Sequence, residues 1–232
     1  MATDRDNISR IEVVADGLKE LADDVIFIGG ACAQFYVTAP ELRDYRQTKD
    51  VDCIIKIYTY SEYEKYSSRL RGLGFKHDTS AGAPIVRWVY NGIAVDTIPD
   101  ETTVVGFSPI RWFKEGREYS IEHTLPSGRS INILPLSYFL ASKLAASKER
   151  GGGDYLTDHD IEDIVNIIDG NEHLNEISSA PESVKEYVIQ TFKKLVADDN
   201  FKVSIAGHLG YDDIAAERAK SVLGKMMEIC SQ

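Results

Sequence analysis

The chain has 232 residues, of which 43% are apolar, and a formal net charge of −11. This length allows one large domain or two small ones, and the apolar share is ordinary for a globular protein. The negative charge disfavours broad, sequence-blind wrapping of nucleic acid, which needs many cationic contacts to phosphates. A small basic groove that grips one RNA end stays possible, because cations gather in four stretches, residues 43–49, 69–76, 111–117 and 143–150.

Neither a membrane span nor a secretory signal is expected. No apolar run approaches the length of a spanning helix, and residues 1–10 are polar and charged, unlike a signal peptide. The three cysteines, Cys32, Cys53 and Cys230, are too scattered for a disulfide framework or a zinc site. Together these features predict a cytoplasmic protein.

The first half of the sequence predicts helices and strands in alternation. Apolar residues at helical spacing predict a helix over residues 7–22. Short apolar runs predict strands, and Asn91-Gly92 between two of them is a strong hairpin signal. The expected strands are 25–28, 51–57, 84–90, 93–98, 119–125 and 130–134, and the further expected helices are 31–37 and 60–71.

From Pro135 onward the sequence predicts helices alone. They cover residues 136–148, 158–168, 181–197 and 211–229, and Gly151 to Gly153 break the chain between the first two. The sequence therefore predicts an α/β (more narrowly α+β) core over residues 1–134, with a mixed sheet and flanking helices. A helical domain follows over residues 135–232.

Three aspartates lie within or next to apolar strands. Asp50 and Asp52 open the strand 51–57, and the two-residue period of a strand places both side chains on one face. Asp96 lies inside the strand 93–98, which could lie beside it. Three carboxylates on one sheet face repel each other unless a cation lies between them, and such hard oxygen ligands suit magnesium. The pattern predicts metal-assisted phosphoryl or nucleotidyl transfer, although each acid taken alone also fits an exposed strand face.

Three further features have both a functional and a structural interpretation. The Gly29-Gly30 pair could let the backbone approach a phosphate at a helix start, or could form an ordinary tight turn. Lys143 could neutralise a triphosphate, or could belong to a solvated cationic face. Asp158 could act in the site, or could cap the helix that follows it. The residues alone do not choose between these interpretations.

Taken together, these residues resemble the minimal nucleotidyltransferase superfamily. Its signature is a Gly-Gly or Gly-Ser turn, an acid-x-acid pair and a third acid on a later strand, which match Gly29-Gly30, Asp50-Val51-Asp52 and Asp96. Within the superfamily the chain resembles the AbiEii-type nucleotidyltransferases, known as toxins of bacterial toxin–antitoxin and phage-abortive systems. The further matching stretches are Arg46-x-Thr48-x-Asp50-Val51-Asp52, Ser142-Lys143-Leu144-x-Ala146 leading to Arg150, and Asp158-His159-Asp160-Ile161-Glu162-Asp163-Ile164.

The similarity covers residues 24–170, with one departure. The lysine motif of the toxins continues through a lysine–aspartate pair, whereas this chain has Gly151 to Asp154 and then a gap. The resemblance implies a nucleotidyltransferase fold and release of pyrophosphate from a nucleoside triphosphate. The implied catalytic residues are Asp50, Asp52, Asp96 and Lys143, of which the three acids bind two Mg²⁺ ions. The implied nucleotide-binding residues are Gly29, Gly30, Arg46, Thr48, Arg150 and Asp158.

The acceptor is open to three hypotheses. Resemblance to the toxins implies an RNA acceptor, such as the end of a tRNA, and an antitoxin protein as partner; the basic stretches around Arg69 and Arg111 would then flank the site. A small hydroxylated molecule such as an antibiotic is the alternative, because an acidic chain suits a cationic compound better than RNA. The third hypothesis is a catalytically silent nucleotide- or partner-binding module.

Overall fold

The structure is a computed structural model that describes residues 6–39, 46–100, 110–150, 154–210 and 213–231. The chain divides into two compact units, and each is described by itself below. The first consists of Met1–Cys32 and Arg46–Pro135, and the second of Ala33–Tyr45 and Leu136–Gln232. Within these described ranges, every helix is too short or too polar to traverse a lipid bilayer.

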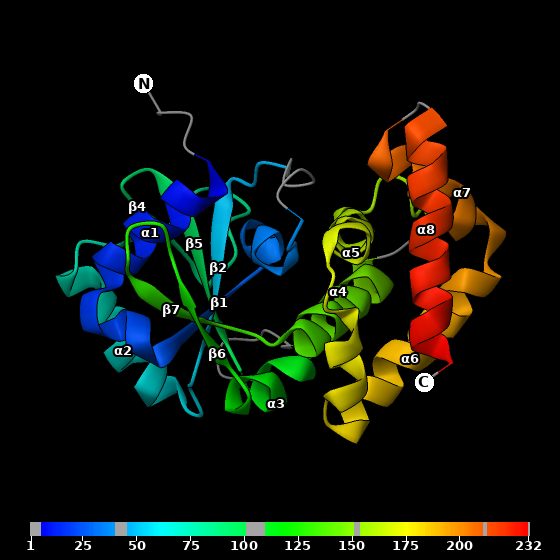
Figure 1. Cartoon of the computed structure of the whole chain (residues 1–232). Coiled ribbons are helices and arrows are strands. Elements are labelled where there is room, and N and C mark those ends of the chain that lie inside the picture. The colour runs from blue at the N-terminus through cyan, green and yellow to red at the C-terminus, as the bar shows by residue number, and fades with distance from the viewer. Residues whose placement is uncertain (1–5, 40–45, 101–109, 151–153, 211–212, 232) are drawn as a thin grey trace. The chain divides into compact units, whose positions relative to one another are not determined.

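The first unit is built on a seven-stranded mixed sheet (Figure 1) with the order β3-β4-β5-β2-β1-β7-β6. The strands are β1 (Val25–Ile28), β2 (Asp50–Ile55), β3 (Lys76–His77), β4 (Arg87–Tyr90), β5 (Ile93–Pro99), β6 (Ile121–Thr124) and β7 (Ser130–Ile133). The pairs β2–β5 and β1–β7 are parallel, and the other neighbouring strands are antiparallel. The predicted α/β class with a mixed sheet is confirmed.

The two longest helices of this unit, α1 and α2, begin at capping residues. The Asp6 carboxylate accepts a hydrogen bond from the Ser9 amide (2.7 Å) and starts α1, and Thr59 with Glu62 forms a capping box that starts α2. The elements are α1 (Asn7–Leu18), the 3₁₀ helix η1 (Lys19–Asp24), α2 (Tyr60–Gly72) and α3 (Trp112–Glu118), while the 3₁₀ helix η2 (Gly30–Tyr36) leads into the second unit. The predicted helix 7–22 ends earlier, at Leu18, because Lys19 takes a positive φ of 51°.

The hairpin between β4 and β5 turns where the sequence predicts it. Asn91 and Gly92 have φ angles of 48° and 79°, the left-handed values that a two-residue hairpin turn requires. Trp88 of β4 and Val95 of β5 are paired across this hairpin, and both residues are fully buried. β3 and α3 are absent from the sequence-based prediction, because neither carries a hydrophobic repeat long enough to be recognised.

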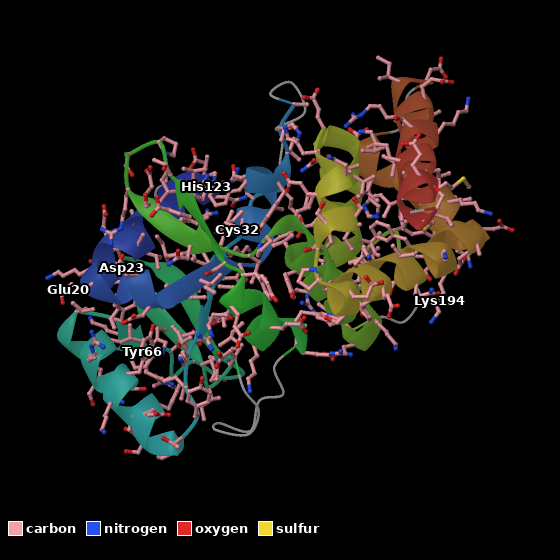
Figure 2. The ribbon with its side chains drawn as sticks, turned by 60° about the horizontal axis from the view of Figure 1, so that its bottom comes forward. Glu20, Asp23, Cys32, Tyr66, His123 and Lys194 are labelled. Atoms are coloured by element: carbon pink, nitrogen blue, oxygen red, sulfur yellow. The ribbon has the colours of Figure 1, made fainter. Side chains whose placement is uncertain are left out.

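The interior of the first unit is apolar, and every residue of β1 is buried. Figure 2 shows the positions of two interior residues, Cys32 and Tyr66, and of Glu20, which is exposed. Cys32 and Cys53 are buried thiols, and neither they nor Cys230 of the second unit form a disulfide. Burial raises the pKa of the Cys53 thiol well above its usual range, so this cysteine is a packed core residue and not a reactive one.

The second unit is helical. Its elements are α4 (Leu136–Arg150), α5 (His159–Gly170), the 3₁₀ helix η4 (Leu174–Ser179), α6 (Glu182–Ala197), α7 (Asp199–Leu209) and α8 (Asp213–Cys230). The segment before residue 40 joins this unit through Thr38 and Ala39, whose amides both donate to the Gly170 carbonyl at 3.0 Å. The sequence-based prediction missed α7, which Asp198 starts by accepting from the Asn200 amide. The predicted break at residues 151–153 and the predicted start of the last helix at 211 lie outside the described residues.

Candidate active site

Three aspartates meet on one face of the sheet in the first unit. β2 and β5 are parallel neighbours, and their register pairs Asp52 with Asp96. Asp50 precedes Asp52 by two residues and therefore shares its face. One carboxylate oxygen from each of the three lies within 4.8 Å of the others. The three carboxylates thus lie close enough together to hold a metal ion.

The donor set fits a divalent cation. Mg²⁺ takes oxygen ligands at about 2.1 Å, so opposite ligands of one ion are roughly 4.2 Å apart. Small side-chain rotations bring oxygens that lie within 4.8 Å into that range. Asp96 is buried, whereas Asp50 and Asp52 are half-buried. A cation held here would therefore keep an open side for water or for a substrate phosphate.

Gly29 is required by the position of Asp52. β1 pairs Ile28 with Asp52, so Gly29 follows directly beside this carboxylate. A Cβ atom at Gly29 would lie only 1.9 Å from the Asp52 Oδ2 atom, and the φ angle of 80° is itself one that other residues rarely adopt. The clash and the φ angle both explain why the first residue of the Gly29-Gly30 pair is a glycine. Gly30 begins the 3₁₀ helix η2 directly after it.

Arg87 is a site residue that the sequence analysis missed. It lies on β4 directly opposite Asp96. Its Nε atom donates to Asp96 Oδ1 (2.7 Å), and Nη2 donates both to Asp96 Oδ2 (2.6 Å) and to Asp50 Oδ2 (3.1 Å). The hydrogen bonds to Asp96 raise the pKa of Arg87 above its ordinary value, against the opposing effect of burial. The hairpin signal could have found this residue, because a two-residue turn at 91–92 pairs Arg87 with Asp96.

Thr48 and Arg46 lie at the entrance to β2. The Thr48 amide donates to Asn7 Oδ1 (2.9 Å), and its hydroxyl donates to the Asp50 carbonyl (3.1 Å). The Arg46 carbonyl accepts from Asn7 Nδ2 (3.0 Å), and Arg10 donates to the Thr48 carbonyl. These contacts tie α1 to the start of the strand that carries Asp50. The nucleotide-binding role of Thr48 and Arg46 stays a prediction.

Lys143 and Arg150 lie on α4 in the second unit. Lys143 is buried, and its Nζ atom donates to Asp160 Oδ1 (3.1 Å) and Asp163 Oδ2 (2.5 Å) of α5. Burial lowers the pKa of Lys143, but the carboxylates of Asp163 and Asp160 raise it by more, so this lysine stays charged. Arg150 is largely exposed and forms an ion pair with Asp160 at 3.2 Å. The catalytic role of Lys143 and the nucleotide contact of Arg150 stay predictions.

Asp158 caps the N-terminus of α5. One carboxylate oxygen accepts from the amides of Asp160 (2.8 Å) and Ile161 (3.4 Å), and the other accepts from the Ser147 hydroxyl (2.6 Å). The capping interpretation of this residue is therefore supported by its contacts, which also join α5 to α4. A direct contact between Asp158 and a nucleotide stays a prediction.

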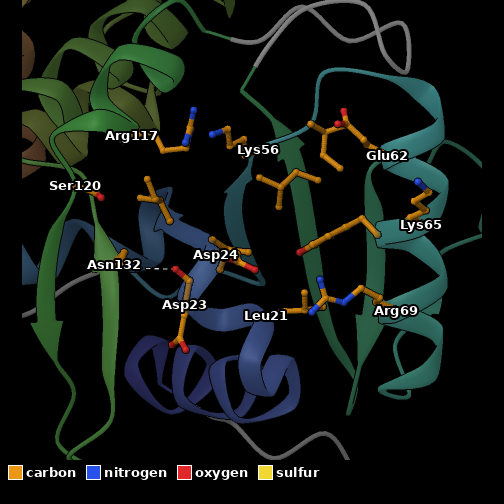
Figure 3. A pocket seen from close by; sticks show the side chains of 15 residues that line it. Leu21, Asp23, Asp24, Lys56, Glu62, Lys65, Arg69, Arg117, Ser120 and Asn132 are labelled. Atoms are coloured by element: carbon orange, nitrogen blue, oxygen red, sulfur yellow. Dashed lines mark hydrogen bonds between the residues drawn. The ribbon is translucent and has the colours of Figure 1, made fainter.

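Two of the cationic stretches meet at a pocket of about 550 Å³ in the first unit. The pocket is lined by Val25 at the start of β1 and by Ile55 at the end of β2, whereas Asp50 and Asp52 lie at the start of β2. Figure 3 shows Lys65 and Arg69 projecting from α2, with Lys56 and Arg117 across the pocket from them. Arg69 and Arg117 therefore lie at the opposite end of β2 from the acids. The expectation that the stretches around Arg69 and Arg111 flank an RNA site stays a prediction.

Neither a family model nor a curated protein matches the chain. Among solved structures, it is similar to the crystal structure of an antigenic nucleotidyltransferase-like protein from Paracoccidioides brasiliensis. The identity is 16%, the TM-score is 0.50, and the match covers 87% of this chain and 93% of that one.

Two structures of the antibiotic-resistance factor ANT(2'')-Ia match with lower TM-scores. The solution structure has 16% identity, a TM-score of 0.46, and coverage of 82% of this chain and 92% of that one. The crystal structure in complex with adenylyl-2''-tobramycin has 15% identity, a TM-score of 0.45, and coverage of 81% and 97%. The fold assignment rests on the first match alone: the chain has the fold of a nucleotidyltransferase-like protein.

Proposed function

We propose that the chain is a divalent-metal-dependent nucleotidyltransferase that moves a nucleoside monophosphate from a nucleoside triphosphate to an acceptor hydroxyl. The observation that carries this proposal is the meeting of Asp50, Asp52 and Asp96 within 4.8 Å on one sheet face. Three carboxylates at this spacing repel each other, and a hard cation relieves the repulsion. The turn at Gly29 and the likeness of the fold to a nucleotidyltransferase-like protein add support.

The proposed reaction assigns a role to each acid. Asp50 and Asp52 would hold the cations together with the triphosphate, and Asp96 would complete the set of ligands. When bound, two magnesium ions stabilise the charge on the attacking and leaving oxygens of an in-line displacement. The acceptor oxygen forms a bond to the α-phosphorus while the bond from that phosphorus to the β-phosphate oxygen breaks, and pyrophosphate leaves. The proton of the acceptor hydroxyl passes to Asp96, once this carboxylate has released Arg87.

The resemblance also assigns triphosphate contacts to Lys143 and Arg150, and these assignments stay part of the proposal. Lys143 carries the positive charge that a triphosphate requires, and its contacts with Asp160 and Asp163 keep that charge in place. Arg150 is largely exposed and can turn toward a phosphate. In the first unit, Arg46 orients Asp50 or contacts a phosphate, and Thr48 positions the entrance to β2.

Two acceptor classes remain within this proposal. An RNA acceptor corresponds to a toxin-type enzyme with an antitoxin partner, as the resemblance to the AbiEii-type proteins implies. A cationic hydroxylated small molecule is favoured by the net charge of −11, because an acidic protein attracts cations over long range. The position of Arg69 and Arg117 at the opposite end of β2 from the acids also favours the small molecule.

A transfer assay tests the proposal. The protein is incubated with each of the four nucleoside triphosphates labelled at the α-phosphate, with Mg²⁺, and with either total RNA or a panel of cationic hydroxylated compounds. We expect pyrophosphate release and label on one of the two acceptor classes. Asp52→Asn should slow transfer by at least about 100-fold, because it removes the charge of one metal ligand without changing its volume.

The matched control is Asp16→Asn. Asp16 lies on α1 of the same unit, is largely exposed and pairs only with Arg129 at 3.2 Å within the described contacts. Its neutralisation changes the net charge by the same amount and should leave the transfer rate intact. Full activity of the Asp52→Asn protein would contradict the proposal. Binding of a triphosphate without turnover, or no binding of any triphosphate, would instead support the catalytically silent nucleotide- or partner-binding module.

A further inference from the structure

Arg87 already neutralises the carboxylates that the proposed function assigns to a cation. Its guanidinium donates to both oxygens of Asp96, at 2.6 and 2.7 Å, and to one oxygen of Asp50 at 3.1 Å. The strand register holds the arginine in place, because β4 pairs Arg87 directly with Asp96. The folded chain therefore carries a built-in positive charge inside the acidic cluster.

This contact uses the same atoms that a metal ion would use. A bidentate guanidinium–carboxylate pair occupies lone pairs on both oxygens of the acid. The Asp96 side chain is only 11% exposed and the Arg87 side chain 25% exposed, so water screens the pair weakly. A divalent ion that takes Asp96 as a ligand must therefore share these oxygens with charge-assisted hydrogen bonds or displace them, and it must also approach a fixed positive charge.

We infer that Arg87 is an internal counter-ion that competes with the divalent cation for Asp96 and Asp50. The inference rests on the proposed function, because it concerns the cation which that function requires. In the cation-free protein Arg87 relieves the repulsion among the three carboxylates. When a cation binds, it shares Asp96 with the guanidinium or displaces it, and the two positive charges repel each other, so metal affinity is lower than the acids alone would provide.

A purely structural role for Arg87 predicts a different result. A cross-strand ion pair that only stabilises the hairpin would make an Arg87 variant less stable, with no gain in metal affinity. Competition predicts lower stability without metal together with a gain in metal affinity. The sign of the change in affinity therefore separates the two roles.

The test is a titration with Mn²⁺ in the absence of nucleotide. Binding is measured by calorimetry or by the EPR signal of free Mn²⁺. Arg87→Gln should bind Mn²⁺ at least about ten-fold more tightly than the wild type, which corresponds to about 1.4 kcal/mol. Arg87→Lys keeps the charge but loses the planar fork, so we expect an intermediate affinity. Mn²⁺ should also raise the melting temperature of Arg87→Gln by more than that of the wild type.

Two controls isolate the competition. Arg129→Gln removes one positive charge from the same unit, at a residue that pairs with Asp16 and the Lys19 carbonyl, and should leave the Mn²⁺ affinity unchanged. In an Asp96→Asn background, Arg87→Gln should produce a smaller gain, because the main contested ligand is already lost. If Arg87→Gln does not fold, the comparison of Arg87→Lys with the wild type decides.

An unchanged or weaker Mn²⁺ affinity in the folded Arg87 variants overturns the inference, as does a failure of these variants to bind Mn²⁺. The proposed function fails separately. Nucleotidyl transfer by a wild type whose Arg87 variants show no gain in affinity would leave the function standing and remove the competition. A gain in Mn²⁺ affinity in the Arg87 variants, with no nucleotidyl transfer to any acceptor by the wild type, would support the competition and remove the proposed function.

Discussion

Replacing Gly29 with alanine adds a single methyl group beside a proposed metal ligand. The new Cβ atom would lie 1.9 Å from Asp52 Oδ2, whereas real Cβ contacts stay above 3.0 Å. The carboxylate and the turn must therefore move apart by about 1 Å. Alanine at the φ angle of 80° adds strain of roughly 1–2 kcal/mol. A shift of about 1 Å in a catalytic group can cost about 100-fold in rate. We therefore expect Gly29→Ala to lose about 100-fold in nucleotidyl transfer while its free energy of unfolding falls by only about 1–3 kcal/mol.

Gly128→Ala is the matched control for this experiment. Gly128 has a φ angle of 85°, and nothing lies within 4 Å of a Cβ atom placed there. The control introduces the same backbone strain without a clash, so it should be destabilised by about 1–2 kcal/mol and keep its transfer rate. Transfer is measured with α-labelled triphosphate, and stability by urea unfolding. Equal transfer rates in the two variants would refute the reasoning. Backbone strain would then explain the whole change in rate, and the clash with Asp52 would have no effect on it.

Two further predictions concern stability. Lys143→Met leaves Asp160 and Asp163 buried without their shared cation, so we expect a loss of about 3–5 kcal/mol in urea unfolding, and a loss below about 1 kcal/mol would contradict a role for this ion pair. The cap bond from the Ser9 amide holds the pKa of Asp6 below 3.8, so its contribution is fully present above pH 3.8 and disappears as the pH falls through the lower folded value. Asp6→Ala should therefore cost about 1 kcal/mol at neutral pH and progressively less below pH 3.8, and a cost independent of pH between 3 and 7 would contradict the cap.

The elements that the sequence predicts correctly depend on interactions between residues that are close together in the sequence. β1 covers the predicted residues 25–28, because a run of four apolar residues that follows two aspartates and ends at two glycines has few alternatives. The hairpin of β4 and β5 forms because Asn91 and Gly92 accept positive φ angles. That turn also decides that Arg87 faces Asp96, so one contact of the site was readable from the sequence.

Local signals fail where an element is short or is completed by distant residues. β3 has two residues and α3 has seven, so neither carries a full hydrophobic repeat. α7 was missed because its buried residues are few and close together, Phe201, Ser204 and Ile205. The contacts of Lys143 with Asp160 and Asp163 link two helices and depend on how α4 and α5 pack.

By itself, the sequence determined which acids share a strand face, since Asp50 and Asp52 obey the two-residue period of β2. It could not determine that β5 lies next to β2 in parallel, because a long connection separates these strands and nothing local specifies their order or register. Only the tertiary structure places Asp96 beside Asp52 and brings the Asp52 carboxylate against Gly29. The tertiary structure also determines the charge balance of the site. Arg87 can donate hydrogen bonds to both Asp96 and Asp50 only when β4, β5 and β2 are in register.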